Sequence, residues 1–134
     1  CVTGVQTCAL PICEPDVSSI VHLLADDRLG ATREIATDPP PREYMDAFTA
    51  IDGDPNNELV VATLDELVVG VLQLTYIPNL THRGSWRGMI EGVRVSSSHR
   101  SAGVGTGMLQ WAIDRCRARA CRSVRENRTE NHEN

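Results

Sequence analysis

The chain has 134 residues, 41% of them hydrophobic and 23% charged, with a formal net charge of −5 at pH 7. These values are ordinary for a single water-soluble domain. The acidic balance excludes a nucleic-acid backbone as the main partner, because such a partner requires a basic face. No apolar run approaches the ~18 residues that a membrane span requires, so we expect no membrane partner.

The first segment, residues 1–13, carries no charge and holds three of the five cysteines. The stretch from Val2 to Ile12 resembles the in-frame translation of a common sequencing-library adapter. We therefore predict that residues 1–13 are non-native, dispensable and poorly ordered. An apolar segment could still be recruited as an edge strand beside a neighbouring hairpin.

The elements expected next follow from periodicity and breakers. A helix should begin at Pro15-Asp16 and end near residue 26, and a loop should cover residues 27–41. A second helix is predicted over residues 42–51, with Tyr44, Phe48 and Ile51 on one side. The β-branched runs at 58–64 and 67–77, joined by Asp65-Glu66, predict an antiparallel hairpin.

A third strand is predicted over residues 87–95, then a helix from residue 103 to about 119 and a final strand near Val124. Residues 125–134 contain no aliphatic or aromatic residue, which indicates a polar tail. The order of elements predicts an α+β fold with a mostly antiparallel sheet flanked by helices.

The cysteines lie at positions 1, 8, 13, 116 and 121. None form a Cys-x-x-Cys motif, and no histidine stands at ligand spacing from them, so we expect no metal site. An odd number without a disulfide framework suggests reduced thiols in a cytoplasmic protein. Cys116 falls on the apolar face of a helix and is expected to be a small buried hydrophobe.

The most specific motif follows the third strand. A Ser-rich loop leads to Arg100-Ser101-Ala102-Gly103-Val104-Gly105-Thr106, an Arg-x-x-Gly-x-Gly pattern that opens an amphipathic helix. Backbone N–H groups at a helix N-terminus cradle phosphates. Gly103 allows unusual dihedrals, and Gly105 removes a side chain that would block a ligand. A tight turn and helix start without any ligand is the alternative interpretation.

The order Ile90 to Val95, loop, Arg-x-x-Gly-x-Gly and apolar helix resembles the acetyl-CoA-binding motif of the GNAT N-acetyltransferase superfamily. The resemblance extends from about Asp16 to about Val124 and then stops. It implies a partial GNAT-like acyl-CoA N-acyltransferase domain over residues 14–124, incomplete at both ends. The first strand of that fold would lie where residues 1–13 stand, and the elements after the final strand would be absent.

The resemblance also implies acetyl-CoA as co-substrate and no metal. The backbone of Val93, Arg94 and Val95 would hold the pantetheine arm in the gap between this strand and a parallel neighbour. The pyrophosphate would lie on the backbone of residues 100–106, with Arg100 adding a charge-assisted contact. The seven residues of this cradle are Arg100, Ser101, Ala102, Gly103, Val104, Gly105 and Thr106.

The reaction implied is direct attack of a small-molecule amine on the thioester, which needs a base and an oxyanion donor. Glu91 is the candidate base, expected beside the acetyl group and partly buried; the alternative pairs it with Arg87. The N–H of Val93 is the candidate oxyanion donor. No residue matches the tyrosine that supplies the thiolate acid in many relatives. Residues 26–34 would wall the acceptor site or form a plain solvated loop.

Three functions remain open: an N-acetyltransferase, a catalytically incompetent CoA-binding or interaction fragment of one, and nucleotide binding by a Rossmann-like unit. The last fits worse, because no third glycine stands at the right offset. The gap that would hold the pantetheine arm needs a strand on each side. Only the strand ending at Val95 is expected, so we predict at best weak activity. An uncovered helix face with Met108, Leu109 and Ile113 should favour aggregation or a homodimer.

Overall fold

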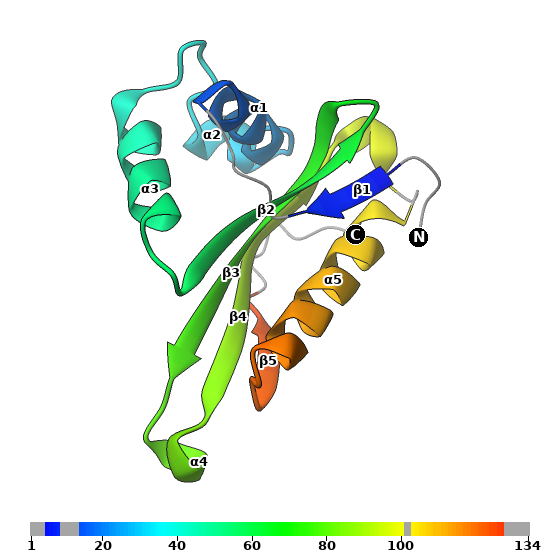
Figure 1. Cartoon of the computed structure of the whole chain (residues 1–134). Coiled ribbons are helices and arrows are strands. Elements are labelled where there is room, and N and C mark those ends of the chain that lie inside the picture. Colours follow the sequence, from blue (N-terminus) through cyan, green and yellow to red (C-terminus); the bar gives the residue numbers. More distant parts are fainter. Residues whose placement is uncertain (1–4, 9–13, 101–102, 128–134) are drawn as a thin grey trace.

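The computed structural model describes residues 5–8, 14–100 and 103–127, which form a five-stranded sheet with strand order β1-β2-β3-β4-β5. Helices α1, α2 and α3 lie on one side of this sheet, and α5 crosses the other side (Figure 1). The predicted α+β fold is confirmed. The elements are β1 (Val5–Cys8), α1 (Glu14–Leu24), α2 (Gly30–Arg33), α3 (Arg42–Asp52), β2 (Asn57–Leu64), β3 (Leu67–Pro78), α4 (Thr81–Gly84), β4 (Trp86–Val95), the 3-10 helix η1 (Ser97–His99), α5 (Val104–Ala118) and β5 (Ser123–Glu126).

The sheet is antiparallel from β1 to β4 and parallel between β4 and β5. Hairpin β2–β3 turns on Asp65 and Glu66, whose φ angles are 49° and 67°. Two consecutive left-handed residues are what a tight two-residue hairpin turn requires. The predicted hairpin is thus confirmed, and the first two long helices agree with prediction to within about two residues. None of the helices in the described part of the chain is long and apolar enough to span a membrane.

A β-bulge interrupts β4 at Gly92. Gln73 of β3 pairs with Glu91 and Val71 pairs with Arg94, so that Gly92 and Val93 together oppose one residue of β3. Gly92 has a φ of 63°, which a residue without a Cβ adopts at little cost. The extra residue shifts the alternation of side chains. Val93 therefore joins the core beneath α5, while Arg94 points to the α1 side of the sheet.

The larger core lies between α5 and the sheet. Met108, Ala112 and Cys116 of α5 are completely buried, so the expected exposure of Met108 is wrong: the sheet covers that helix face. Burial raises the pKa of the Cys116 thiol to about 11, which agrees with its expected role as a small buried hydrophobe. A second core cluster under α1 includes Ile20, Leu23 and residues of β2 and β3.

Gly88 of β4 lets α5 approach the sheet closely, because a Cβ at this position would lie 2.3 Å from Cys116 Sγ. We expect Gly88→Ala to lower the free energy of unfolding by about 1–3 kcal/mol through overpacking. In a Cys116→Ala background the sulfur is absent, and the same change should cost much less. Urea denaturation of the two single variants and the double variant measures this coupling. Additive losses would contradict the proposed close contact.

The short edge strands β1 and β5 differ from expectation. Val5–Cys8 pairs with Val61–Leu64 of β2, so these residues form the edge strand that was the alternative to disorder. Whether residues 1–13 are native stays a prediction. Arg125 and Glu126, expected in a polar tail, belong to β5 and pair with Met89 and Ile90. Backbone hydrogen bonds to β4 order this segment, and they do not depend on apolar side chains.

A polar cluster fixes the C-terminal half of α5 to the β2–β3 hairpin. The Glu58 carboxylate accepts hydrogen bonds from the Tyr76 hydroxyl and from Arg115 Nε and Nη2, the latter two at 3.1 and 2.8 Å. The Arg119 guanidinium lies 3.6 Å from the centroid of the Tyr76 ring. Burial raises the pKa of Glu58, but the hydrogen bonds from Arg115 and Tyr76 outweigh it and hold that pKa below its usual value.

A carboxyl group with a lowered folded-state pKa stabilises the fold above its unfolded pKa of about 4.3 and loses this contribution as pH falls through the folded value. We therefore expect Glu58→Gln to show a smaller loss of unfolding free energy between pH 6 and pH 3 than the parent chain. Urea denaturation at several pH values measures it. Glu43→Gln, an exposed change of the same chemistry, should keep the parent's acid loss. Equal profiles for the Glu58→Gln variant and the parent would rule out this contribution.

Candidate functional site

Strand β5 runs parallel to the first half of β4, and all four residues of β5 pair with it. Their pairing ends at Ile90 and Glu126, and the Asn127 N–H donates a last hydrogen bond of 2.8 Å to the Ile90 carbonyl. Strand β4 continues to Val95 and, within the described residues, pairs there with β3 alone. Within the described part of the chain, the edge of β4 over residues 91–95 is therefore open on the β5 side. Strand β5 lies where a final strand was predicted, near Val124; residues 128–134, which would continue it along this edge, lie outside the described residues, so the absence of a second wall stays a prediction.

A loop of eight residues, 96–103, connects the end of β4 to the N-terminus of α5. Gly103 precedes the helix with a φ of 81°, which confirms the expected unusual dihedral. The first intrahelical hydrogen bond runs from the Gly107 N–H to the Gly103 carbonyl, at 3.0 Å. The N–H groups of Val104, Gly105 and Thr106 therefore have no partner within the helix. No side chain of the described residues caps these N–H groups. They can therefore donate hydrogen bonds to an anion.

The loop between β4 and α5 is held by the end of α1. The Asp26 carboxylate accepts a hydrogen bond of 2.8 Å from the Ser97 N–H, and the Asp26 carbonyl accepts one of 2.8 Å from Arg100 Nη2. The Arg100 guanidinium has further donors for a ligand, and its contact with phosphate stays a prediction. Ser101 and Ala102 of the predicted cradle lie outside the described residues.

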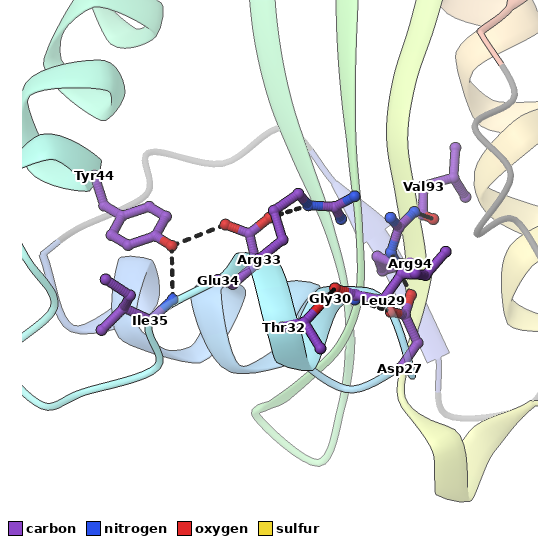
Figure 2. A network of polar contacts seen from close by, with 10 residues as sticks. All are labelled: Asp27, Leu29, Gly30, Thr32, Arg33, Glu34, Ile35, Tyr44, Val93 and Arg94. Carbon is purple, nitrogen blue, oxygen red and sulfur yellow. Dashed lines mark hydrogen bonds and ion pairs between the residues drawn. The ribbon is translucent and has the colours of Figure 1, made fainter.

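A nearly buried ion pair joins the same two regions (Figure 2). Arg94 Nε lies 3.1 Å from Asp27 Oδ2, and the two side chains are only 8% and 15% exposed. The Asp27 carboxylate also accepts the Gly30 N–H at the start of α2. The predicted role of Arg94 concerned its backbone alone, and the sequence analysis did not predict this side-chain pair. The pair positions β4 against the α1–α2 loop.

We expect Asp27→Ala to lower the free energy of unfolding by about 3–5 kcal/mol, because it leaves the Arg94 guanidinium buried without a counter-charge. Chemical denaturation measures the change. The matched control is Asp46→Ala, whose pair with Arg42 is 3.8 Å long and mostly exposed, so its removal should cost under about 1 kcal/mol. A loss for Asp27→Ala as small as that of the control would contradict the assignment.

The loop expected to wall the acceptor site contains the short helix α2, which the sequence did not predict. Beyond it the Tyr44 hydroxyl of α3 donates a hydrogen bond of 2.8 Å to Glu34 and accepts one of 3.0 Å from the Ile35 N–H (Figure 2). Burial and the neighbouring Glu34 carboxylate raise the pKa of Tyr44. The segment is thus fixed to β4 at one end and to α3 at the other, and it is not a plain solvated loop.

Glu91, the candidate base, is exposed, so the expected partial burial is wrong. It immediately precedes the Gly92 bulge at the sheet's open edge. Neither the alternative ion pair with Arg87 nor any other ion pair of Glu91 occurs within the described part of the chain. Glu91 is therefore accessible to an acceptor or a water molecule.

A row of polar side chains that sequence reasoning missed leads to Glu91. Asn57 Oδ1 accepts hydrogen bonds from Thr75 Oγ1 and Gln73 Nε2, at 2.7 and 3.2 Å. Gln73 is the cross-strand neighbour of Glu91, and directly paired residues project from the same face. The alternation of polar with apolar residues in β3 could have revealed this row. It places hydrogen-bonding groups beside the candidate base.

Two other expectations can be compared with the structure. The Rossmann-like alternative is wrong, because the sheet is mainly antiparallel instead of built from parallel strand–helix–strand units. Among the described residues no group of three His, Cys, Asp or Glu side chains could hold a metal ion.

A mainly antiparallel sheet with a bulged fourth strand, a parallel fifth strand and a glycine-initiated helix between them in sequence is the arrangement of the GNAT-like α+β fold. The sequence model of the acetyltransferase (GNAT) family matches residues 20–134, and the chain belongs to this family. The match continues past Val124, where the resemblance was expected to stop.

Solved structures agree with this assignment. A transcriptional regulator from Bacillus halodurans C-125 is 43% identical, with a TM-score of 0.88 over 94% of this chain and 83% of that one. An acetyltransferase from Trypanosoma brucei is 24% identical, with a TM-score of 0.72 over 94% and 84%. A predicted acetyltransferase from Clostridium acetobutylicum, solved with acetyl-CoA, is 16% identical, with a TM-score of 0.69 over 94% and 80%. The last two show the fold alone.

Proposed function

We propose that this chain transfers the acetyl group of acetyl-CoA to the amine of a small-molecule acceptor. One observation carries the proposal: in the described part of the chain, the open β4 edge is followed, after one loop, by three N–H groups of α5 that have no partner. An extended pantetheine arm fits an open strand edge as an added strand would. A pyrophosphate fits the N–H groups at the helix start. Acetyl-CoA would supply the thioester whose C–S bond breaks.

The side chains around the bulge support the chemistry of the acceptor. Glu91 is placed to take a proton from the amine, directly or through water, as the new N–C bond forms and the thiolate departs. Val93 lies within the bulge and has no paired residue in β3, so we propose its N–H as the oxyanion donor. The polar row of Asn57, Gln73 and Thr75 offers hydrogen bonds to an acceptor beside Glu91.

A thiol-release assay with acetyl-CoA and a panel of small amines tests the proposal. We expect thiol release that depends on one or more amines and on the presence of the chain. CoA binding without turnover for any amine would favour the non-catalytic CoA-binding fragment instead. Absence of CoA binding would overturn both. The free thiols of Cys116 and Cys121 support the further proposal that the protein acts in a reducing, cytoplasmic environment.

A further inference from the structure

A polar pocket of about 310 Å³ lies at the opposite end of β4 from the glycine loop. Its walls come from the β3–β4 connection, the beginning of β4 and the segment that leads into β5. Three arginines, Arg87, Arg122 and Arg125, line it together with His82 and the hydroxyl groups of Ser85 and Ser123. None of the described lining residues is acidic. We propose that this pocket binds the oxyanion group of a small molecule.

The charges in the pocket favour an anion. Among the described residues none of its three arginines forms an ion pair, and Arg87 Nε is buried without a hydrogen-bond partner. Three guanidinium groups gathered without a counter-charge from the described residues repel one another, although the chain as a whole has a net charge of −5. An oxyanion would relieve this repulsion and accept the paired N–H groups of a guanidinium.

The backbone holds these arginines in place. Arg87 pairs with Ser123 in the parallel ladder, and the Arg122 N–H donates a hydrogen bond of 2.8 Å to the Trp86 carbonyl. Ser123 and Arg125 project from one face of β5, because side chains alternate along a strand. Val124, on the opposite face, packs against the core under α5. This register fixes the Arg125 side chain on the face that lines the pocket.

The pocket is separate from the candidate cofactor cradle. Its β4 residue, Arg87, and the end of that strand at Val95 stand eight residues apart, which corresponds to about 26 Å in an extended chain. The volume exceeds that of a lone phosphate ion and lies at the small end of ligand sites. We therefore assign the pocket to a phosphate or carboxylate group carried by a small molecule, and not to the pyrophosphate of a cofactor at α5.

The test is a titration of the full chain with sodium phosphate at constant ionic strength, followed by the amide resonances in ¹H–¹⁵N spectra. We expect saturable shifts at Ser85, Arg87 and Ser123 that persist when CoA is already bound. Arg87→Gln and Arg125→Gln should each weaken phosphate binding roughly 10-fold, as expected for loss of a charge-assisted contact. Arg125→Lys keeps the positive charge but loses the forked donor geometry of the guanidinium. It should weaken phosphate binding less than Arg125→Gln does.

The matched control is Arg117→Gln, which removes the same charge from an exposed position on α5 and should leave phosphate binding unchanged. Equal weakening by this control would reduce the effect to general electrostatics and overturn the pocket. Phosphate shifts confined to residues 103–106, or no saturable shifts, would also overturn it. Acetate and glycerol phosphate then separate a carboxylate from a phosphate ester: the tighter ligand identifies the group.

Discussion

In the Gly105→Glu variant, CoA should no longer raise the melting temperature. For the parent chain, a ligand at 100 times its dissociation constant adds about 2.7 kcal/mol of stability, which raises the melting midpoint by roughly 10 °C. The Gly105 N–H is one of the three N–H groups in the first turn of α5 that have no partner among the residues the structure describes. A carboxylate at this position would repel the pyrophosphate expected there. Thermal denaturation with and without CoA measures the loss.

The chain offers a close control two residues further along the same helix. Gly107 is exposed, nothing lies within 4 Å of an added Cβ, and its N–H already bonds to the Gly103 carbonyl. Gly107→Glu should therefore keep most of the response to CoA. An unchanged response in Gly105→Glu would exclude the α5 N-terminus as the cofactor site. Both variants should fold, because an acidic residue near a helix N-terminus is favourable.

Local patterns were sufficient to predict the long elements of this fold. The 3.6-residue period of α5 and the β-branched runs around Asp65-Glu66 depend only on neighbouring residues. The short strands β1 and β5 were harder, since Arg125 and Glu126 become ordered through backbone pairing with β4. Such pairing joins segments that are distant in sequence, and polar composition does not forbid it.

The candidate site, like the fold, could be predicted only in part. The left-handed Gly103 and the glycine-initiated start of α5 followed from the Arg-x-x-Gly-x-Gly spacing. The pair between Arg94 and Asp27 could not be predicted, because it depends on the Gly92 bulge to bring Arg94 to the α1 side of the sheet. An isolated glycine in a strand is a known sign of a bulge, and it was the one available clue.

The position of Glu91 beside the bulge also determines how its removal should affect the kinetics. Glu91 stands at the open edge beside Gln73, whereas the N–H groups proposed for the pyrophosphate lie at the far end of the loop. Glu91→Gln should therefore lower kcat by about 10²-fold or more, the usual loss for a positioned base. The KM for acetyl-CoA should change little. Glu91→Asp, which keeps a carboxylate at shorter reach, should recover part of the rate.

The same thiol-release assay with the best amine measures these rates. Glu66→Gln is the control, because Glu66 is exposed in the β2–β3 turn and its loss should leave kcat unchanged. A Glu91→Gln variant as active as the parent would show that another group, or water alone, accepts the proton. A rise in the KM for acetyl-CoA with constant kcat would place Glu91 in cofactor binding instead. Only a loss in kcat that leaves CoA binding intact fits a base at the bulge.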